Sequence, residues 1–231
     1  MWYIDYWYIV LVLPAILFSL WASFMVKSTY NKYSKQNSIS GMTAAQVVRR
    51  VLDANGLYNV GVGRVAGNLT DHYDPRTNMI NLSDTVYSST STAAIGVACH
   101  EAGHAIQHKE EYLPIKIRTA IIPAANIGST LAIPLIIIGM ILGSLQLSYV
   151  GVICFSAVAL FQLVTLPTEF DASKRALQTI EANNYLSPAE TKGAKKVLTA
   201  AAMTYVAALA VTIMQILRFV LILNGGRRNN D

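Results

Sequence analysis

The chain has 231 residues, of which 53% are hydrophobic and only 13% are charged, and its mean hydropathy is +0.40. About a quarter of the residues of an average soluble domain are charged, so this composition predicts a membrane protein and excludes an ordinary soluble enzyme. The formal net charge of +5 is modest. We interpret the basic residues as signals of membrane topology, and no nucleic-acid partner is expected.

The N-terminal segment predicts a first transmembrane helix within residues 1–26. Residues 7–26 are nearly uncharged and match the roughly 20 residues needed to cross a bilayer. A cleaved signal peptide is the alternative, but no basic stretch precedes the run and no small-residue cleavage site follows it. The segment is therefore expected to stay attached.

Residues 27–118 are polar enough to form a region outside the bilayer. Residues 43–46, Thr-Ala-Ala-Gln, have the form of a capping box, and the apolar positions that follow predict a helix over 43–55. Short strands are predicted at 60–66, 69–73 and 79–82, with a turn at 74–78. A small sheet therefore precedes the stretch that carries the chemistry.

That stretch contains His100-Glu101-Ala102-Gly103-His104. On a helix, residues four apart lie one turn above each other, so His100 and His104 can direct two imidazoles at one Zn²⁺ with Glu101 beside the open position. Zn²⁺ with three protein ligands lowers the pKa of a bound water to about 7, and a carboxylate can take its proton. The pattern predicts a hydrolase with one Zn²⁺ per chain and Glu101 as general base.

A third ligand must come from elsewhere in the chain. The metzincin extension is absent, because Glu110 stands where that motif has its third histidine. Glu169 is favoured, since two predicted membrane crossings return it to the side of the motif. Glu181 and His108 are alternatives, although His108 is rotated by about 80° from His100 on the helix. Asp171 lies nearly opposite Glu169 on a helix, so both are not expected to bind the metal.

The remaining segments complete a predicted four-helix topology. Two apolar runs within 119–166 form a transmembrane hairpin, 167–196 returns outside the bilayer, 197–223 crosses again, and 224–231 is a polar tail. Arg218 in the last span must lie near an end, extend its side chain to the bilayer surface, or find a partner. Lysines and arginines are concentrated in 27–118 and 167–196, which predicts that the catalytic side is cytoplasmic. Arg227 and Arg228 would then lie on the outer side, which counts against this orientation but is outweighed.

Other residues near the motif have candidate roles. An edge strand beside a metal helix can bind an extended substrate through backbone hydrogen bonds, and the strand nominated for this is Asn78, Met79, Ile80, Asn81 and Leu82. A plain structural hairpin is the alternative. His72 is either a solvated hairpin residue or a group that orients a ligand or stabilises the transition state, and His108 and Asp171 are further candidates for orienting a ligand.

Several stretches together resemble a known family. They are Asp71-His72-Tyr73-Asp74-Pro75-Arg76-Thr77, the motif continued to Gln107, and Leu166-Pro167-Thr168-Glu169-Phe170-Asp171-Ala172-Ser173. Together with the N-terminal span they resemble bacterial membrane zinc metallopeptidases of the neutral zinc metallopeptidase 2 type, and the match covers nearly the whole chain. These are more distantly similar to gluzincins, including membrane peptidases related to the CAAX prenyl endopeptidase.

The resemblance implies a mainly α, polytopic helical membrane protein with about four transmembrane helices and a small α+β zincin-like catalytic subdomain. It also implies that Glu169 is the third ligand, as a glutamate on a later helix is in gluzincins. The pattern departs at Ser173, where gluzincins usually have an aspartate that orients a ligating histidine. Asp171 or a backbone carbonyl is expected to take that role.

The first functional hypothesis is a multi-pass zinc endopeptidase of the cell membrane that cleaves membrane or membrane-near polypeptides at the cytoplasmic face. A non-proteolytic scaffold that keeps a zinc site is the second, but such a site has no use for Glu101. An intramembrane protease is the third, and the polar residues around the motif disfavour it. A regulatory membrane partner is compatible with the first hypothesis.

Overall fold

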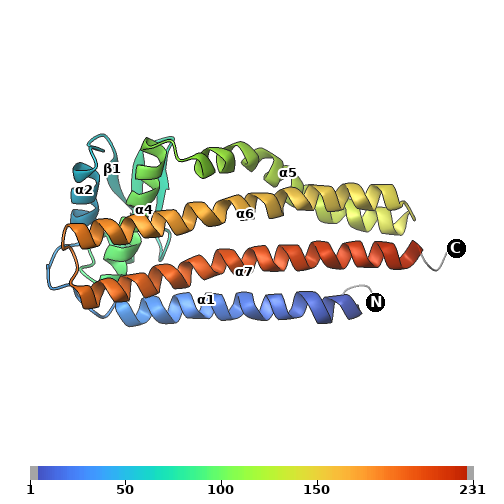
Figure 1. Ribbon diagram of the computed structural model, residues 1–231, viewed down its shortest axis with the longest axis horizontal. Coiled ribbons are helices and arrows are strands. Elements are labelled where there is room, and N and C mark those ends of the chain that lie inside the picture. Colours follow the sequence, from blue (N-terminus) through green and yellow to red (C-terminus); the bar gives the residue numbers. More distant parts are fainter. Residues whose placement is uncertain (1–4, 228–231) are drawn as a thin grey trace. The chain divides into compact units, whose positions relative to one another are not determined.

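The computed structural model describes residues 5–227, and it confirms a mainly α, polytopic membrane architecture. Four helical segments are long and apolar enough to cross a bilayer. They are a π-helical turn Tyr8–Val12 continued by α1 (Leu13–Tyr33), then α5 (Leu113–Ile141), α6 (Leu145–Ala182) and α7 (Pro188–Arg227), and they can be followed by their labels in Figure 1. Trp2 and Tyr3, at the expected start of the first span, lie outside the described residues.

The described chain divides into two compact units. One comprises residues 5–22, 116–166 and 204–227, and the other comprises 23–115 and 167–203. We call the first the membrane unit and the second the metal unit. Helix α6 has 38 residues, which corresponds to about 57 Å and exceeds the roughly 30 Å hydrocarbon core. The chain passes from one unit to the other between residues 166 and 167 without a break in α6, and Pro167 lies inside the continuous helix.

In the membrane unit, the buried arginine of the last span is paired and two helices approach closely. Arg218 is 7% exposed and donates from Nε to Asp5 at 2.8 Å, so the arginine of the last span does find a partner. Its guanidinium also lies 5.2 Å from the ring centroids of Tyr8 and Phe219.

Helices α5 and α6 touch at Gly151, where an added Cβ would lie 2.7 Å from the Ala132 carbonyl oxygen. Residues 224–227, expected in a polar tail, extend α7.

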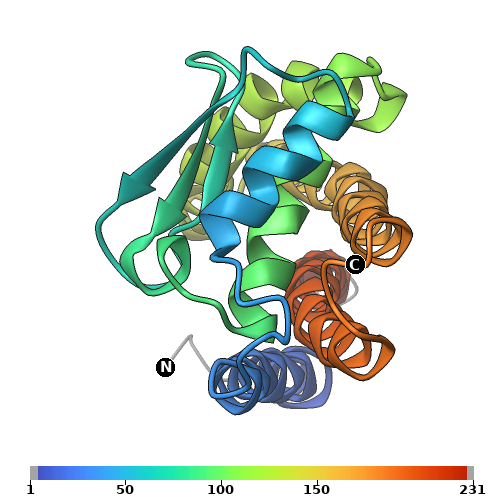
Figure 2. The same ribbon diagram turned by 90° about the vertical axis from the view of Figure 1, so that its left-hand side faces the viewer.

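The metal unit begins with the predicted amphipathic helix. Helix α2 (Ala44–Ala54) starts at a complete capping box, because the Thr43 hydroxyl accepts from the Gln46 N–H and the Gln46 side chain accepts from the Thr43 N–H. Its apolar face is fully buried. The metal-motif helix α4 (Thr92–Lys109) follows the short α3 (Asp84–Tyr87) and is capped by the Ser91 hydroxyl, which accepts from the Ala94 N–H. Figure 2 shows α2 and α4 on the same side of the sheet.

The sheet has three strands in the order β1-β3-β2. These are β1 (Gly61–Val65), β2 (His72–Asp74) and β3 (Met79–Ser83), with β3 parallel to β1 and antiparallel to β2. The nomination of Asn78 to Leu82 as a substrate edge strand is therefore wrong, because both edges of β3 are already paired. Asn78 itself lies in the preceding turn at φ 55°. The strand with a free edge beside α4 is β2.

One hydrophobic core joins α2, α4, the sheet and the ends of α6 and α7 within the metal unit. Leu52, Ile80, Leu82 and Ile95 are fully buried in it. Cys99 is a free, buried cysteine in the same core. Burying α4 between the sheet and the other helices fixes the direction in which the motif residues point.

Candidate metal centre

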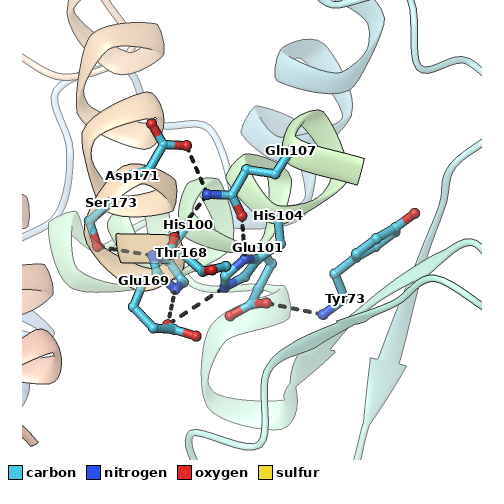
Figure 3. A network of polar contacts seen from close by, with 9 residues as sticks. All are labelled: Tyr73, His100, Glu101, His104, Gln107, Thr168, Glu169, Asp171 and Ser173. Atoms are coloured by element: carbon cyan, nitrogen blue, oxygen red, sulfur yellow. Dashed lines mark hydrogen bonds and ion pairs between the residues drawn. The ribbon is translucent and has the colours of Figure 1, made fainter. Parts of the chain in front are cut away.

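The metal unit brings His100, His104 and Glu169 together. One potential ligand atom from each lies within 4.8 Å of the other two. The Nε2 atoms of His100 and His104 lie 3.3 and 3.7 Å from the same Glu169 oxygen, Oε2, and the two rings stand nearly perpendicular at 4.7 Å between centroids (Figure 3). Two imidazole nitrogens and a carboxylate oxygen are a donor set that Zn²⁺ takes in catalytic sites with three protein ligands. The residues present thus fit zinc.

Helix α6 can deliver Glu169 because it approaches α4 very closely. At Gly103, between the two motif histidines, an added Cβ would lie 2.6 Å from the carbonyl oxygen of Ala172. Ala172 is fully buried. Glycine and alanine at this crossing let the two backbones touch, and this contact places the Glu169 carboxylate in front of both imidazoles.

The cluster is shielded from solvent and negatively charged. Glu169 is 3% exposed and Glu101 is 8% exposed. Burial by itself lowers the pKa of His104, but the interaction with Glu169 and the charges of Glu101 and Glu169 outweigh it, and the pKa is raised. A raised pKa favours the protonated imidazole, and protonation of His104 competes with metal binding.

Glu101 is held at the edge of the sheet. Its Oε2 accepts a hydrogen bond from the backbone N–H of Tyr73 at 3.0 Å. Tyr73 lies opposite Ile80 in the β2–β3 ladder, and its N–H points away from β3 to the outer edge of β2. The outer edge of β2 thus meets the carboxylate that the sequence assigns as the base (Figure 3).

Each histidine also has a partner on its other ring nitrogen. His100 Nδ1 lies 3.1 Å from the Ser173 hydroxyl, so the residue that departs from the gluzincin aspartate still contacts a motif histidine. His104 Nδ1 lies 3.0 Å from Oε1 of Gln107. Asp171 reaches His104 only through Gln107, whose Nε2 donates to it at 2.8 Å.

Sequence reasoning missed Gln107. The available signal was its place three residues after His104 in a largely apolar stretch, where a glutamine that becomes buried must find partners. His108 contacts the Tyr73 ring at 5.5 Å between centroids, and His72 is exposed and hydrogen-bonds Thr70 and Asn81. Among residues 5–227 the metal-competent cluster comprises His100, His104 and Glu169, without His72, His108, Asp171 or Glu181.

The fold and this cluster define a class of protein: a polytopic helical membrane protein with a His-Glu-x-x-His helix and a glutamate on a later helix. Residues 8–224 match the model of a family described as "Putative neutral zinc metallopeptidase", and the chain belongs to that family. It is 49% identical over 223 residues, covering 96% of this chain and 99% of the relative, to "Putative membrane protease YugP" of Bacillus subtilis (strain 168). No solved structure matches.

Proposed function

We propose that this protein is a zinc-dependent endopeptidase with one Zn²⁺ per chain, bound by His100, His104 and Glu169. The observation that carries the proposal is the convergence of these three donors within 4.8 Å, with the buried Glu101 carboxylate beside them. The family description and the name of the relative from Bacillus subtilis agree with this chemistry. No observation favours a non-proteolytic scaffold.

Zinc bound at this site supplies a Lewis acid that polarises the scissile carbonyl and makes water acidic enough to act as a nucleophile near neutral pH. The role of Glu101 is to accept the proton of the attacking water on its carboxylate and to donate it to the leaving amine. The Tyr73 N–H holds that carboxylate in place at 3.0 Å. The low exposure of Glu101 and Glu169 keeps bulk water away from the charges that drive the reaction.

The outer edge of β2 is the proposed binding site for an extended polypeptide. Residues His72–Asp74 have one edge paired with β3 and the other directed to the metal cluster. The Tyr73 N–H on that edge already donates to Glu101, so a substrate strand laid there would pair with the other backbone groups of the edge, next to Glu101. Such backbone pairing is largely independent of the substrate's side chains. We therefore propose unfolded or extended segments of membrane or membrane-near proteins as substrates.

Cleavage of an unstructured polypeptide tests the activity. Protein purified in detergent and loaded with zinc is expected to cut a casein-type substrate at internal bonds, as seen by mass spectrometry of the fragments, and a zinc chelator is expected to stop cleavage. Release of terminal residues alone would contradict an endopeptidase. A zinc-loaded protein that leaves every extended substrate intact would instead support a scaffold role.

The proposed orientation places the metal unit in the cytoplasm. The basic residues near the ends of the spans support this side. An epitope inserted into the β1–β2 loop, residues 66–71, is expected to resist protease added to intact spheroplasts and to be cleaved after the membrane is permeabilised. Cleavage in intact spheroplasts would reverse the orientation.

A further inference from the structure

Two hydrogen-bond acceptors fix the orientation of the Gln107 side-chain amide. Its Nε2 lies 2.8 Å from the Thr168 carbonyl oxygen and 2.8 Å from Oδ2 of Asp171. A carbonyl can only accept a hydrogen bond, and Asp171 already accepts one from the Arg175 guanidinium, so both sites require an N–H donor. The amide nitrogen must face them, and Oε1 must face His104 (Figure 3).

The fixed amide determines which nitrogen of His104 carries the proton. Oε1 of Gln107 is an acceptor at 3.0 Å from Nδ1 of His104, whereas the Glu169 oxygen lies 3.7 Å from Nε2, beyond hydrogen-bond distance, so Nδ1 is the nitrogen placed to donate. In the neutral imidazole this leaves the lone pair on Nε2, which is the atom that faces Glu169. Gln107 is fully buried, and rotating its amide would turn Oε1 toward two acceptor oxygens.

His100 lacks this constraint. Its Nδ1 contacts the Ser173 hydroxyl, which can either donate or accept a hydrogen bond. The serine therefore selects neither tautomer, and the acceptor of fixed position at His100 is Oε2 of Glu169, 3.3 Å from Nε2. The two motif histidines differ in this respect, because only His104 has an acceptor of fixed direction at its Nδ1.

The same amide also ties α4 to the segment that carries the third donor. Thr168 and Asp171 lie on either side of Glu169 on α6, and the Gln107 amide binds both. Arg175 holds Asp171 from the far side, with its Nε 2.5 Å from Oδ2, and its other arm pairs with Glu110 at the end of α4. The network runs from His104 through one amide to the helix of Glu169.

We propose that Gln107 is a positioning residue that imposes the Nδ1–H tautomer on His104 and so presents Nε2 to the metal. The significance of this tautomer for zinc rests on the proposed function, but the tautomer itself does not. Groups that orient a metal-binding histidine contribute about 10- to 100-fold to metal affinity. Loss of the Gln107 acceptor is therefore expected to weaken zinc binding by about that factor.

The tautomer can be read directly by NMR, because the chain has only four histidines. In metal-free protein labelled with ¹⁵N-histidine, at a pH where imidazoles are neutral, His104 is expected to show the Nδ1–H pattern. In Gln107→Met, which removes both the acceptor and the donor at similar length, it is expected to populate the Nε2–H form. Zinc affinity is measured in parallel by chelator competition.

Two further variants separate positioning from folding. Gln107→Glu keeps an acceptor for Nδ1–H but loses the donor to Thr168 and Asp171, so it is expected to preserve the His104 tautomer while lowering thermal stability. Ser173→Ala alters the partner of His100 and is expected to leave the His104 signal unchanged. An unchanged His104 tautomer in Gln107→Met, or an Nε2–H tautomer in Gln107→Glu if Gln107→Met does not fold, would overturn the proposal. Because this readout uses neither zinc nor substrate, a protein without peptidase activity still decides it.

Discussion

Replacing Gly103 with alanine is expected to weaken zinc binding, although glycine to alanine is usually favourable within a helix. The new Cβ would lie 2.6 Å from the backbone oxygen of Ala172, which cannot rotate away as a side chain can. Helices α4 and α6 must separate, and Glu169, three residues before Ala172, moves from the histidines. Overpacking costs about 1–3 kcal/mol. If this cost reduces the free energy of zinc binding, the affinity falls by about 5- to 150-fold.

Chelator competition on the purified variant measures this change. Gly225→Ala is the matched control, since it makes the same substitution in helix α7 where a Cβ meets no atom within 4 Å, and its zinc affinity should equal that of the wild type. Wild-type affinity in Gly103→Ala would show that the contact between α4 and α6 does not position Glu169.

Glu101→Gln is expected to abolish hydrolysis and to leave zinc in place. The glutamine oxygen can still accept the hydrogen bond from the Tyr73 N–H, so the shape of the site is preserved, but the amide cannot accept a proton from water. Proton transfer by a positioned side chain contributes about 10²–10⁴-fold to a rate, and a loss of that order is predicted. Wild-type turnover in Glu101→Gln would require a different base.

Local sequence patterns predicted the parts of the fold that depend on neighbouring residues. The capping box of Thr43 and Gln46 marked the start of α2, and the apolar runs marked the four membrane helices. The motif spacing and the need for a third donor led to Glu169, which the structure places beside both histidines. The capping box, the membrane helices and the motif leave local signatures in spacing or hydropathy, whereas Glu169 was predicted from the membrane crossings and the family resemblance.

The features that the sequence did not reveal depend on long-range contacts. The order β1-β3-β2 arises because β1 pairs with β3 rather than with its neighbour in the chain, and strand periodicity carries no information on that choice. Helix α6 continues through Pro167, where a local rule predicts a boundary. The role of Gln107 was not predicted because two of its partners, Thr168 and Asp171, lie more than sixty residues away in sequence.

The central claim is that His100, His104 and Glu169 form one zinc site. The most direct test is elemental analysis of detergent-purified protein for the wild type, Glu101→Gln, His104→Ala and Glu169→Ala. We expect about one zinc per chain in the wild type and in Glu101→Gln. We expect loss of zinc in His104→Ala and Glu169→Ala, because catalytic zinc sites use three protein ligands. Full zinc content in Glu169→Ala would contradict this claim and would move the third ligand to another residue.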